Sequence, residues 1–273
     1  MSVLIQYYND FISRSADPRV KQWVFMDNPL PTLAIIAVYL LLVLKILPLY
    51  MKNRKPFNLT RIIRLYNIFQ VVACILLIYM YLTAGWIQGE YSIGCAPVDW
   101  SNKPNALRMV GTFYWLYCLK GVELVETIFF ALRKKFNQIS GLHVYHHSST
   151  FFLTWIGCKF VGGGMASVPS MLNSFIHVLM YTYYYMSSLG PEWQKKLRPW
   201  KPRLTICQMI QFTILIIHSL SAFHPECDIP KYFMLLYLPN LVLIFKMFYD
   251  FYKDSYKSKS ASLNHHQREK KIS

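Results

Sequence analysis

The sequence predicts an all-α membrane protein with seven transmembrane helices in one multi-pass domain. Hydrophobic residues make up 54% of the 273, and the mean hydropathy is positive, which is more apolar than an ordinary soluble domain of this length. Seven apolar stretches approach the roughly 20 residues that a helix needs to cross a bilayer. Lysines and arginines gather in alternate connections between these stretches, as expected when successive helices cross a membrane in opposite directions.

The apolar stretches divide the chain into a leading segment, a transmembrane domain and a tail. Residues 1–29 lack the charged start, apolar core and small-residue cleavage site of a secretory signal, so the first helix is expected to target and to anchor the chain. The transmembrane domain covers 30–252, and 253–273 is a polar tail. The expected spans are 30–50, 61–85, 111–132, 140–161, 166–189, 204–223 and 231–252.

The basic residues predict the orientation of the chain. The net charge is +16, from 29 lysines and arginines against 13 acidic residues. Most of the basic residues lie between spans one and two, three and four, and five and six, or in the tail. The positive-inside rule places these regions in the cytosol, with segment 1–29 in the lumen. This distribution gives no support for a nucleic-acid partner; the expected partner is the lipid bilayer.

The last residues suggest the membrane in which the protein resides. The chain ends in "REKKIS", with Lys270 and Lys271 at the fourth and third positions from the end. A dilysine in this position resembles the retrieval signal of endoplasmic reticulum membrane proteins, and the cytosolic tail is where that signal could be read. The expected location is therefore the endoplasmic reticulum membrane.

The cysteines separate into two groups on the same map. Four fall within spans, where a small apolar residue is the default interpretation. Cys95 and Cys227 fall in the lumenal connections between spans two and three and between spans six and seven. Because the lumen is oxidising, we expect a disulfide between them; two free thiols are the alternative.

Polar side chains within the spans predict a site. Inserting an ionisable side chain into the membrane within a span costs roughly 2.5–3.5 kcal/mol of free energy. Each such residue is therefore expected to have a structural or functional role. At a rise of 1.5 Å per residue, these residues fall in the cytosolic half of five helices, which indicates a polar chamber with an apolar extension behind it. They are Lys120, Glu123 and Glu126 in span three, His143, His146 and His147 in span four, Asn173, His177 and Tyr181 in span five, Gln208 and Gln211 in span six, and Lys246 in span seven.

The histidines leave two kinds of chemistry open. His143, His146 and His147 lie within about 100° of one helix face, and His177 is on the next helix. Imidazole is a common ligand for iron and zinc, and membrane desaturases and hydroxylases also contain His-x-x-His-His, but they are richer in histidine. Acyl transfer and acid–base catalysis by imidazole fit four histidines near carboxylates better. A non-enzymatic seven-helix receptor or transporter shares the topology, yet it needs neither polar groups at one level of five helices nor a retrieval signal.

Five motifs resemble those of the very-long-chain fatty acid elongases, the condensing enzymes of the endoplasmic reticulum. They are "KGVELVET" (120–127), "HVYHH" (143–147), "NSFIHVLMYTYYY" (173–185), "TICQMIQF" (205–212) and "CAPVDWSNKPNALRM" (95–109). The resemblance covers nearly the whole chain. One difference is Glu126, where the family pattern usually has Asp before the Thr of the first motif.

The resemblance implies that helices two to seven enclose a tunnel for acyl-CoA. It also implies condensation of acyl-CoA with malonyl-CoA to a 3-ketoacyl-CoA, with release of carbon dioxide and CoA and with no cofactor or metal. His146 matches the residue expected to carry the acyl group as an acyl-imidazole, with His177 facing it and with His143 and His147 orienting the substrates. The implied partners are the other enzymes of the elongation cycle, and a homo-oligomer stays open. The expected substrate-binding residues are Lys120, Glu123, Glu126, Asn173, Tyr181, Gln208, Gln211 and Lys246.

Overall fold

The computed structural model describes residues 6, 10–12 and 14–257, and this part of the chain consists of helices and short connections without any β-strand. Lys270 and Lys271 lie outside the described residues. Each of the seven expected spans overlaps one long helical segment. In chain order, these segments are α2 (Leu30–Leu41) with η2 (Leu42–Ile46) and α3 (Leu47–Met51); α4 (Thr60–Tyr81) with η3 (Leu82–Trp86); α5 (Pro104–Glu123) with α6 (Val125–Leu132); α7 (Gly141–Phe160); α8 (Ser167–Ser187); α10 (Trp200–Leu220) with η6 (Ser221–Phe223); and α11 (Tyr232–Tyr252) with η7 (Lys253–Lys257). The shorter elements are η1 (Pro18–Val20), η4 (Phe136–Gln138), η5 (Gly164–Ala166) and α9 (Pro191–Leu197).

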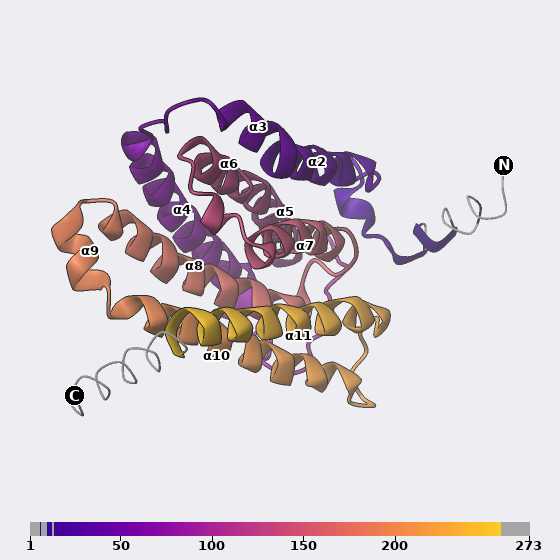
Figure 1. Cartoon of the computed structure of the whole chain (residues 1–273). Coiled ribbons are helices and arrows are strands. Elements are labelled where there is room, and N and C mark those ends of the chain that lie inside the picture. The colour runs from indigo at the N-terminus through magenta and orange to yellow at the C-terminus, as the bar shows by residue number, and fades with distance from the viewer. Residues whose placement is uncertain (1–5, 7–9, 13, 258–273) are drawn as a thin grey trace.

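The long helices run back and forth between two ends of the molecule (Figure 1). One end carries α9, and we call it the α9 end; the start of α2 lies at the other. The closest helix pairs are α4 with α8, α5 with α7, and α10 with α11. These pairings bring α5, α6, α7 and α8 into the middle of the bundle. These four helices carry the histidines and most of the other ionisable residues that the sequence predicted for the site.

Two helices begin earlier than the sequence predicted. The third segment starts at Pro104 and not at residue 111, because proline fits the first turn of a helix, where its missing N–H needs no partner. Polar residues in that turn, such as Arg108, hid it from a search for apolar residues. The sixth segment starts at Trp200 rather than at residue 204, in a turn that is rich in basic residues.

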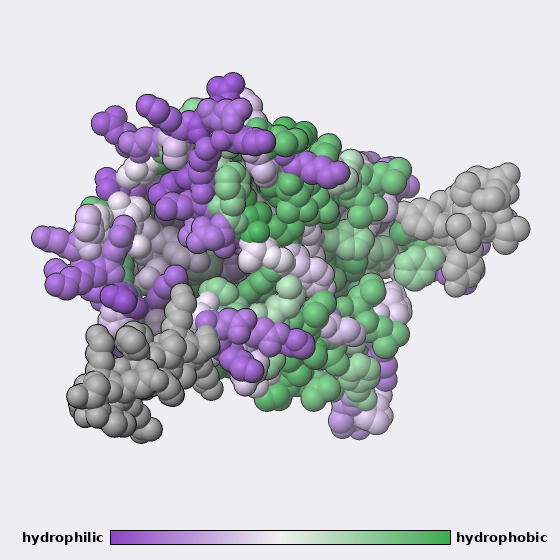
Figure 2. Space-filling model, in the orientation of Figure 1, coloured by the Kyte–Doolittle hydropathy of each residue, from purple (hydrophilic) through white to green (hydrophobic). Residues whose placement is uncertain are grey.

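Within the part of the chain that the structure describes, four segments are long and apolar enough to cross a membrane: Leu30–Met51, Thr60–Trp86, Trp200–Phe223 and Tyr232–Tyr256. The molecule is thus a multi-pass membrane protein. The other long helices are comparable in length but less apolar, since they carry Lys120, Glu123, Glu126 and the histidines. Figure 2 shows hydrophobic residues over α2 and across the middle of one face, while hydrophilic residues gather at the α9 end.

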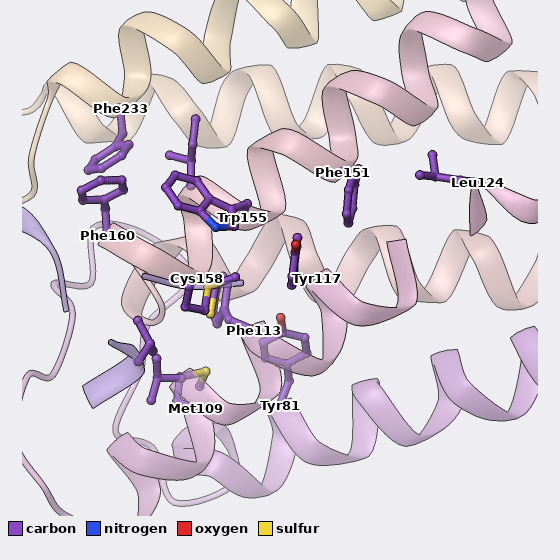
Figure 3. Close-up of a cluster of buried hydrophobic side chains, with 14 of the residues drawn as sticks. Tyr81, Met109, Phe113, Tyr117, Leu124, Phe151, Trp155, Cys158, Phe160 and Phe233 are labelled. Carbon is purple, nitrogen blue, oxygen red and sulfur yellow. The ribbon is translucent and has the colours of Figure 1, made fainter. Parts of the chain in front are cut away.

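An aromatic core joins α5 to α7 (Figure 3). The rings of Tyr117 and Phe151 stack with their centroids 4.9 Å apart. Gly121 leaves room for this contact, since a Cβ there would lie 3.2 Å from the Phe151 ring. Close packing at this level places the polar residues at the end of α5 beside the histidines of α7.

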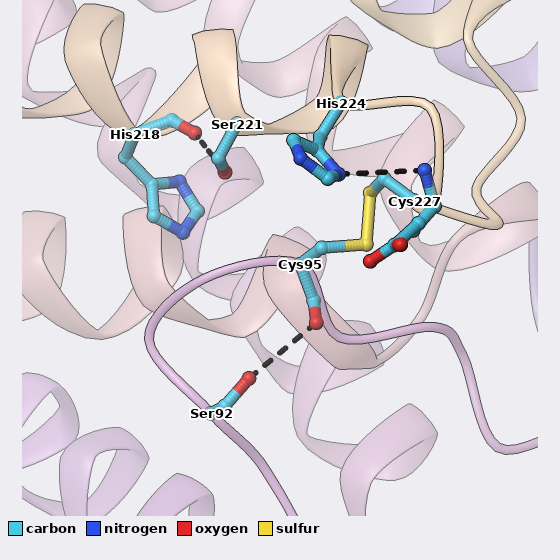
Figure 4. Close-up of a disulfide and its surroundings, with 7 residues drawn as sticks. Ser92, Cys95, His218, Ser221, His224 and Cys227 are labelled. Carbon is cyan, nitrogen blue, oxygen red and sulfur yellow. Dashed lines mark hydrogen bonds between the residues drawn. A yellow bond between two sulfur atoms is a disulfide. The ribbon is translucent and has the colours of Figure 1, made fainter.

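The end opposite α9 is closed by a disulfide between Cys95 and Cys227, with Cα atoms 5.6 Å apart (Figure 4). This pair confirms the expected bridge, and we call this end the disulfide end. The Ala96 carbonyl accepts a hydrogen bond from the Met165 backbone N–H at 2.7 Å. Gly164, just before it, has a φ of 53° and lies directly against the Ala96 and Pro97 carbonyl oxygens, so only glycine fits there.

Candidate functional site

A polar cavity of about 920 Å³ lies at the α9 end, between α4, α6, α7, α8, α10 and α11. Its lining brings together eight of the residues that the sequence predicted for the site. They are Glu126, His143, His146, His147, Asn173, His177, Gln208 and Gln211. Arg133, Lys135 and Lys201 also line this cavity, so basic side chains are present where an anionic ligand would enter.

A second, apolar cavity of about 160 Å³ extends toward the disulfide end between α5, α7, α8, α10 and α11. Met165, Phe233 and Met234 line it together with many aliphatic side chains. The two cavities share four lining residues: His146, Asn173, Gln211 and Phe212. His146 therefore lies at the junction between a polar and an apolar compartment.

Helix α7 presents its three histidines on one side. The Ser140 side chain caps the helix by accepting a hydrogen bond from the His143 backbone N–H at 3.2 Å, which satisfies one of the free donors at the start of a helix. The ring of His147 lies between the other two, with its centroid 4.3 Å from that of His143 and 5.4 Å from that of His146. The spacing of four residues between His143 and His147 brings their rings together, because it is close to one helical turn.

A buried charge network lies behind the histidines. Lys120 Nζ donates to both carboxylate oxygens of Glu123, at 2.9 and 3.0 Å, and the two side chains are 4% and 0% exposed. Glu123 Oε1 also lies 3.1 Å from His177 Nδ1, close but poorly aligned for a hydrogen bond. Glu126 Oε2 is 4.0 Å from His147 Nε2. Each carboxylate thus faces one imidazole, and the network can hold the orientation of both rings.

Sequence reasoning missed the roles of Thr127, which contacts His143, and of Tyr39, which contacts Thr127. The Thr127 hydroxyl lies 2.8 Å from His143 Nε2 and 2.9 Å from the Tyr39 hydroxyl. Tyrosine and threonine are ordinary residues of membrane helices, so neither gave a signal. By contrast, Asn67 and Gln70 on α4 are buried polar residues that a search for amides within spans could have found.

The remaining predicted residues lie outside the polar cavity. Lys120 lines the apolar cavity, and Glu123 is enclosed between Lys120 and His177. Tyr181 is buried behind His177, with ring centroids 5.7 Å apart.

Lys246 was also predicted for the site, and the structure brings it to neither of the two cavities. It lies on the outer surface of α11, with its side chain 70% exposed, and it donates to Asp250 at 2.6 Å. The physical reason is that one turn of α11 places Lys246 beside Asp250, while Asn240, Leu241 and Ile244 face the cavity.

A metal centre was one of the two chemistries that the histidines left open. In residues 6, 10–12 and 14–257, no group of three or more His, Cys, Asp and Glu side chains is arranged to hold a metal ion.

The fold and the site define a class: a multi-pass helical membrane protein with a histidine-lined polar cavity that meets an apolar one. Comparison with known families then places the chain within that class. It belongs to the GNS1/SUR4 family, and its similarity to the family covers residues 24–264.

Curated relatives resemble the chain over most of its length. A very long chain fatty acid elongase of Aedes aegypti is 40% identical over 261 residues, which is 94% of this chain and 73% of the relative. Very long chain fatty acid elongase 4 of Homo sapiens is 42% identical over 242 residues, 89% of this chain and 76% of the relative. Very long chain fatty acid elongase 7 of Drosophila melanogaster is 37% identical over 260 residues, 94% of this chain and 78% of the relative.

Proposed function

We propose that the chain is a fatty acid elongase that condenses a long-chain acyl-CoA with malonyl-CoA. The products are a 3-ketoacyl-CoA, carbon dioxide and free CoA, and the reaction uses no resident cofactor. Family membership and the names of the relatives support elongation. The observation that carries the chemistry is the position of His146 at the junction of the two cavities.

The two compartments fit the two parts of an acyl-CoA. CoA is a bulky polyanion, and the polar cavity with Arg133, Lys135 and Lys201 suits it. The acyl chain is a hydrocarbon that gains free energy by leaving water, at roughly 25 cal/mol per Å², and the apolar cavity suits it. A molecule placed across both has its thioester, the bond that must break, beside His146.

His146 is proposed as the nucleophile. Its imidazole nitrogen attacks the thioester carbon, the carbon–sulfur bond breaks, and CoA leaves with a proton, which forms an acyl-imidazole. Malonyl-CoA then loses carbon dioxide, and the electron pair of the broken carbon–carbon bond forms an enolate. The enolate carbon attacks the acyl carbon, and the imidazole leaves as the new carbon–carbon bond forms and takes up one proton from water in the polar cavity, which restores neutral His146.

Amide donors at the junction support this assignment. An oxyanion is stabilised by donors that are already in place and that need no reorganisation. Gln211 Nε2 is buried, and within the described residues it donates to no hydrogen-bond acceptor. Asn173 shares the junction with it. We assign both amides to the substrate oxygens, and we assign the Lys120–Glu123 pair to holding His177 opposite His146.

We also propose the arrangement in the membrane. All seven helical segments cross the bilayer, and those from α4 to α11 enclose the tunnel. The α9 end faces the cytosol, because basic residues gather in its connections. The disulfide end faces the oxidising lumen of the endoplasmic reticulum, where segment 1–29 begins. The cytosolic end would then face the other enzymes of the elongation cycle.

A half-reaction tests the nucleophile. Purified protein given acyl-CoA alone is expected to release up to one CoA per active site and to gain the mass of one acyl group. His146→Ala should abolish both signals, whereas Asp250→Asn on the outer surface should leave them unchanged. An active enzyme that releases no CoA until malonyl-CoA is added would refute the acyl-imidazole. Absence of any elongation product would refute the function itself, and activity proportional to bound iron would support the oxygenase alternative.

A further inference from the structure

The first helix reaches the histidines through a chain of three side chains. Tyr39 on α2, Thr127 on α6 and His143 on α7 follow one another at 2.9 and 2.8 Å. Tyr39 is 4% exposed and Thr127 is fully buried. The Tyr39 hydroxyl therefore has little access to solvent, and the direction of each hydrogen bond depends on the groups within the chain of three.

Thr127 differs from Thr112 and Thr150, two other helical threonines, in the partners of its hydroxyl. A threonine hydroxyl in a helix commonly donates to the carbonyl four residues earlier, as Thr112 does to Arg108 and Thr150 does to His146. The Thr127 hydroxyl instead has a side chain on each side. The Thr127 hydroxyl can therefore accept a hydrogen bond from Tyr39 and donate one to His143.

Only one arrangement uses every hydrogen of the two hydroxyls. In it, Tyr39 donates to Thr127, and Thr127 donates to His143 Nε2. If His143 Nε2 carried a hydrogen and donated to Thr127, either the Tyr39 or the Thr127 hydrogen would have no acceptor in the trio. A buried donor without an acceptor is costly, so the first arrangement is favoured.

We propose that Tyr39 and Thr127 are positioning residues that fix His143 as the neutral tautomer with its hydrogen on Nδ1. In a neutral imidazole, one nitrogen donates and the other accepts. Since Nε2 accepts from Thr127, Nδ1 carries the hydrogen. His143 lines the polar cavity, so the ring offers an uncharged N–H donor beside His147 and His146.

The consequence for the reaction rests on the proposed function. An N–H donor in the polar cavity can bind a carbonyl or carboxylate oxygen of an incoming substrate, whereas the other tautomer would present a lone pair and repel it. Helix α2 lies outside the helices proposed to enclose the tunnel, yet through Tyr39 it strengthens the hydrogen bond from Thr127 that determines which of these two groups His143 presents.

Nitrogen NMR of the full-length protein labelled with ¹⁵N-histidine tests the tautomer directly. Long-range proton couplings distinguish Nδ1–H from Nε2–H, and a His143→Gln sample identifies the signal. We expect Nδ1–H to be the major form in the wild type. In Thr127→Val, its ratio to Nε2–H should fall roughly fivefold or more, since Nε2 loses its donor. Tyr39→Phe should lower the ratio by less, since Thr127 keeps its hydrogen for Nε2 and loses only the polarisation that a hydrogen bond from Tyr39 supplies. Thr127→Ser should retain the wild-type ratio.

A matched control separates this effect from loss of any buried hydroxyl. Tyr117 and Thr32 form a buried hydroxyl pair at 2.8 Å between α5 and α2 that reaches no histidine. Tyr117→Phe is therefore expected to leave the His143 ratio unchanged.

The outcomes distinguish this proposal from the proposed function. A wild type with mainly Nε2–H, or variants with the wild-type ratio, would overturn the positioning role whatever the activity. The expected tautomers in a protein without condensing activity would uphold that role and refute the proposed function. In an active enzyme, Thr127→Val should lower the rate of condensation at least severalfold and Tyr39→Phe should lower it less, and Thr127→Ser should retain the wild-type rate.

Discussion

Removing the charge of Glu123 should destabilise the protein strongly, because it leaves the Lys120 ammonium without its counterion. The ammonium lies 2.9 and 3.0 Å from the two carboxylate oxygens, and neither side chain is more than 4% exposed. Breaking a buried ion pair from one side costs about 3–5 kcal/mol. At about 2–4 °C per kcal/mol for a large domain, Glu123→Gln should lower the unfolding midpoint by roughly 6–20 °C.

A double variant tests whether the unpaired charge of Lys120 causes the loss of stability. Lys120→Met combined with Glu123→Gln removes both charges of the pair. The double variant should therefore recover more than half of the fall in unfolding midpoint that Glu123→Gln causes. The assay is thermal unfolding in detergent of both single variants and the double, treated as a double-mutant cycle.

The outer surface provides a matched control for the same measurement. Lys246 and Asp250 also form a pair within one helical turn, at 2.6 Å, but their side chains are 70% and 51% exposed. Asp250→Asn should therefore cost about 1 kcal/mol or less. The reasoning would be refuted if Glu123→Gln shifted the midpoint no more than Asp250→Asn, or if the two single losses simply added in the double variant.

Three further changes test other parts of the structure. Cys95→Ser and Cys227→Ser should each cost about 2–5 kcal/mol, because the bridge closes a separation of 132 residues, and the double variant should cost little more; additive losses in unfolding midpoint would argue against the bridge. Gly164→Ala should lower the midpoint far more than Gly89→Ala, since both have positive φ but only Gly164 meets backbone atoms; equal shifts would show that conformation alone matters. Glu126→Asp should keep most elongation activity and Glu126→Gln should lose much of it, because a carboxylate faces His147; equal activities would exclude charge as its role.

The depth of the polar residues along their helices could be predicted from the sequence. Whether each side chain faces the cavity or the outer surface could not. Helical rise alone placed His146, His177 and Gln208 in the same half of the membrane, and the structure brings all three to one cavity. The same reasoning placed Lys246 at that depth, yet it faces outward. Depth depends only on distance along a helix, whereas direction depends on how the helix is rotated against its neighbours. The pairings that set this rotation are made between residues far apart in sequence.

The proposed roles of the hydroxyl groups of Tyr39 and Thr127 could not be predicted from the sequence either. A buried charge stands out in an apolar stretch because it is costly, but Tyr39 and Thr127 cost little wherever they lie. Their importance arises only from meeting His143, which requires α2, α6 and α7 to pack together. The disulfide could be predicted because the positive-inside rule placed both cysteines on the same side of the membrane.

The spacing of Lys120 and Glu123 bears on how the protein is made. A helix with two unpaired charges would insert poorly at the translocon, since each costs roughly 2.5–3.5 kcal/mol. These two charges are three residues apart on one helix, so α5 can neutralise its own charge before any later helix has been synthesised. His177 belongs to α8 and can join Glu123 only after α6 and α7 have been synthesised. The ion pair therefore lets α5 enter the membrane with its own counterion, and the contact between Glu123 and His177 is added when the bundle assembles.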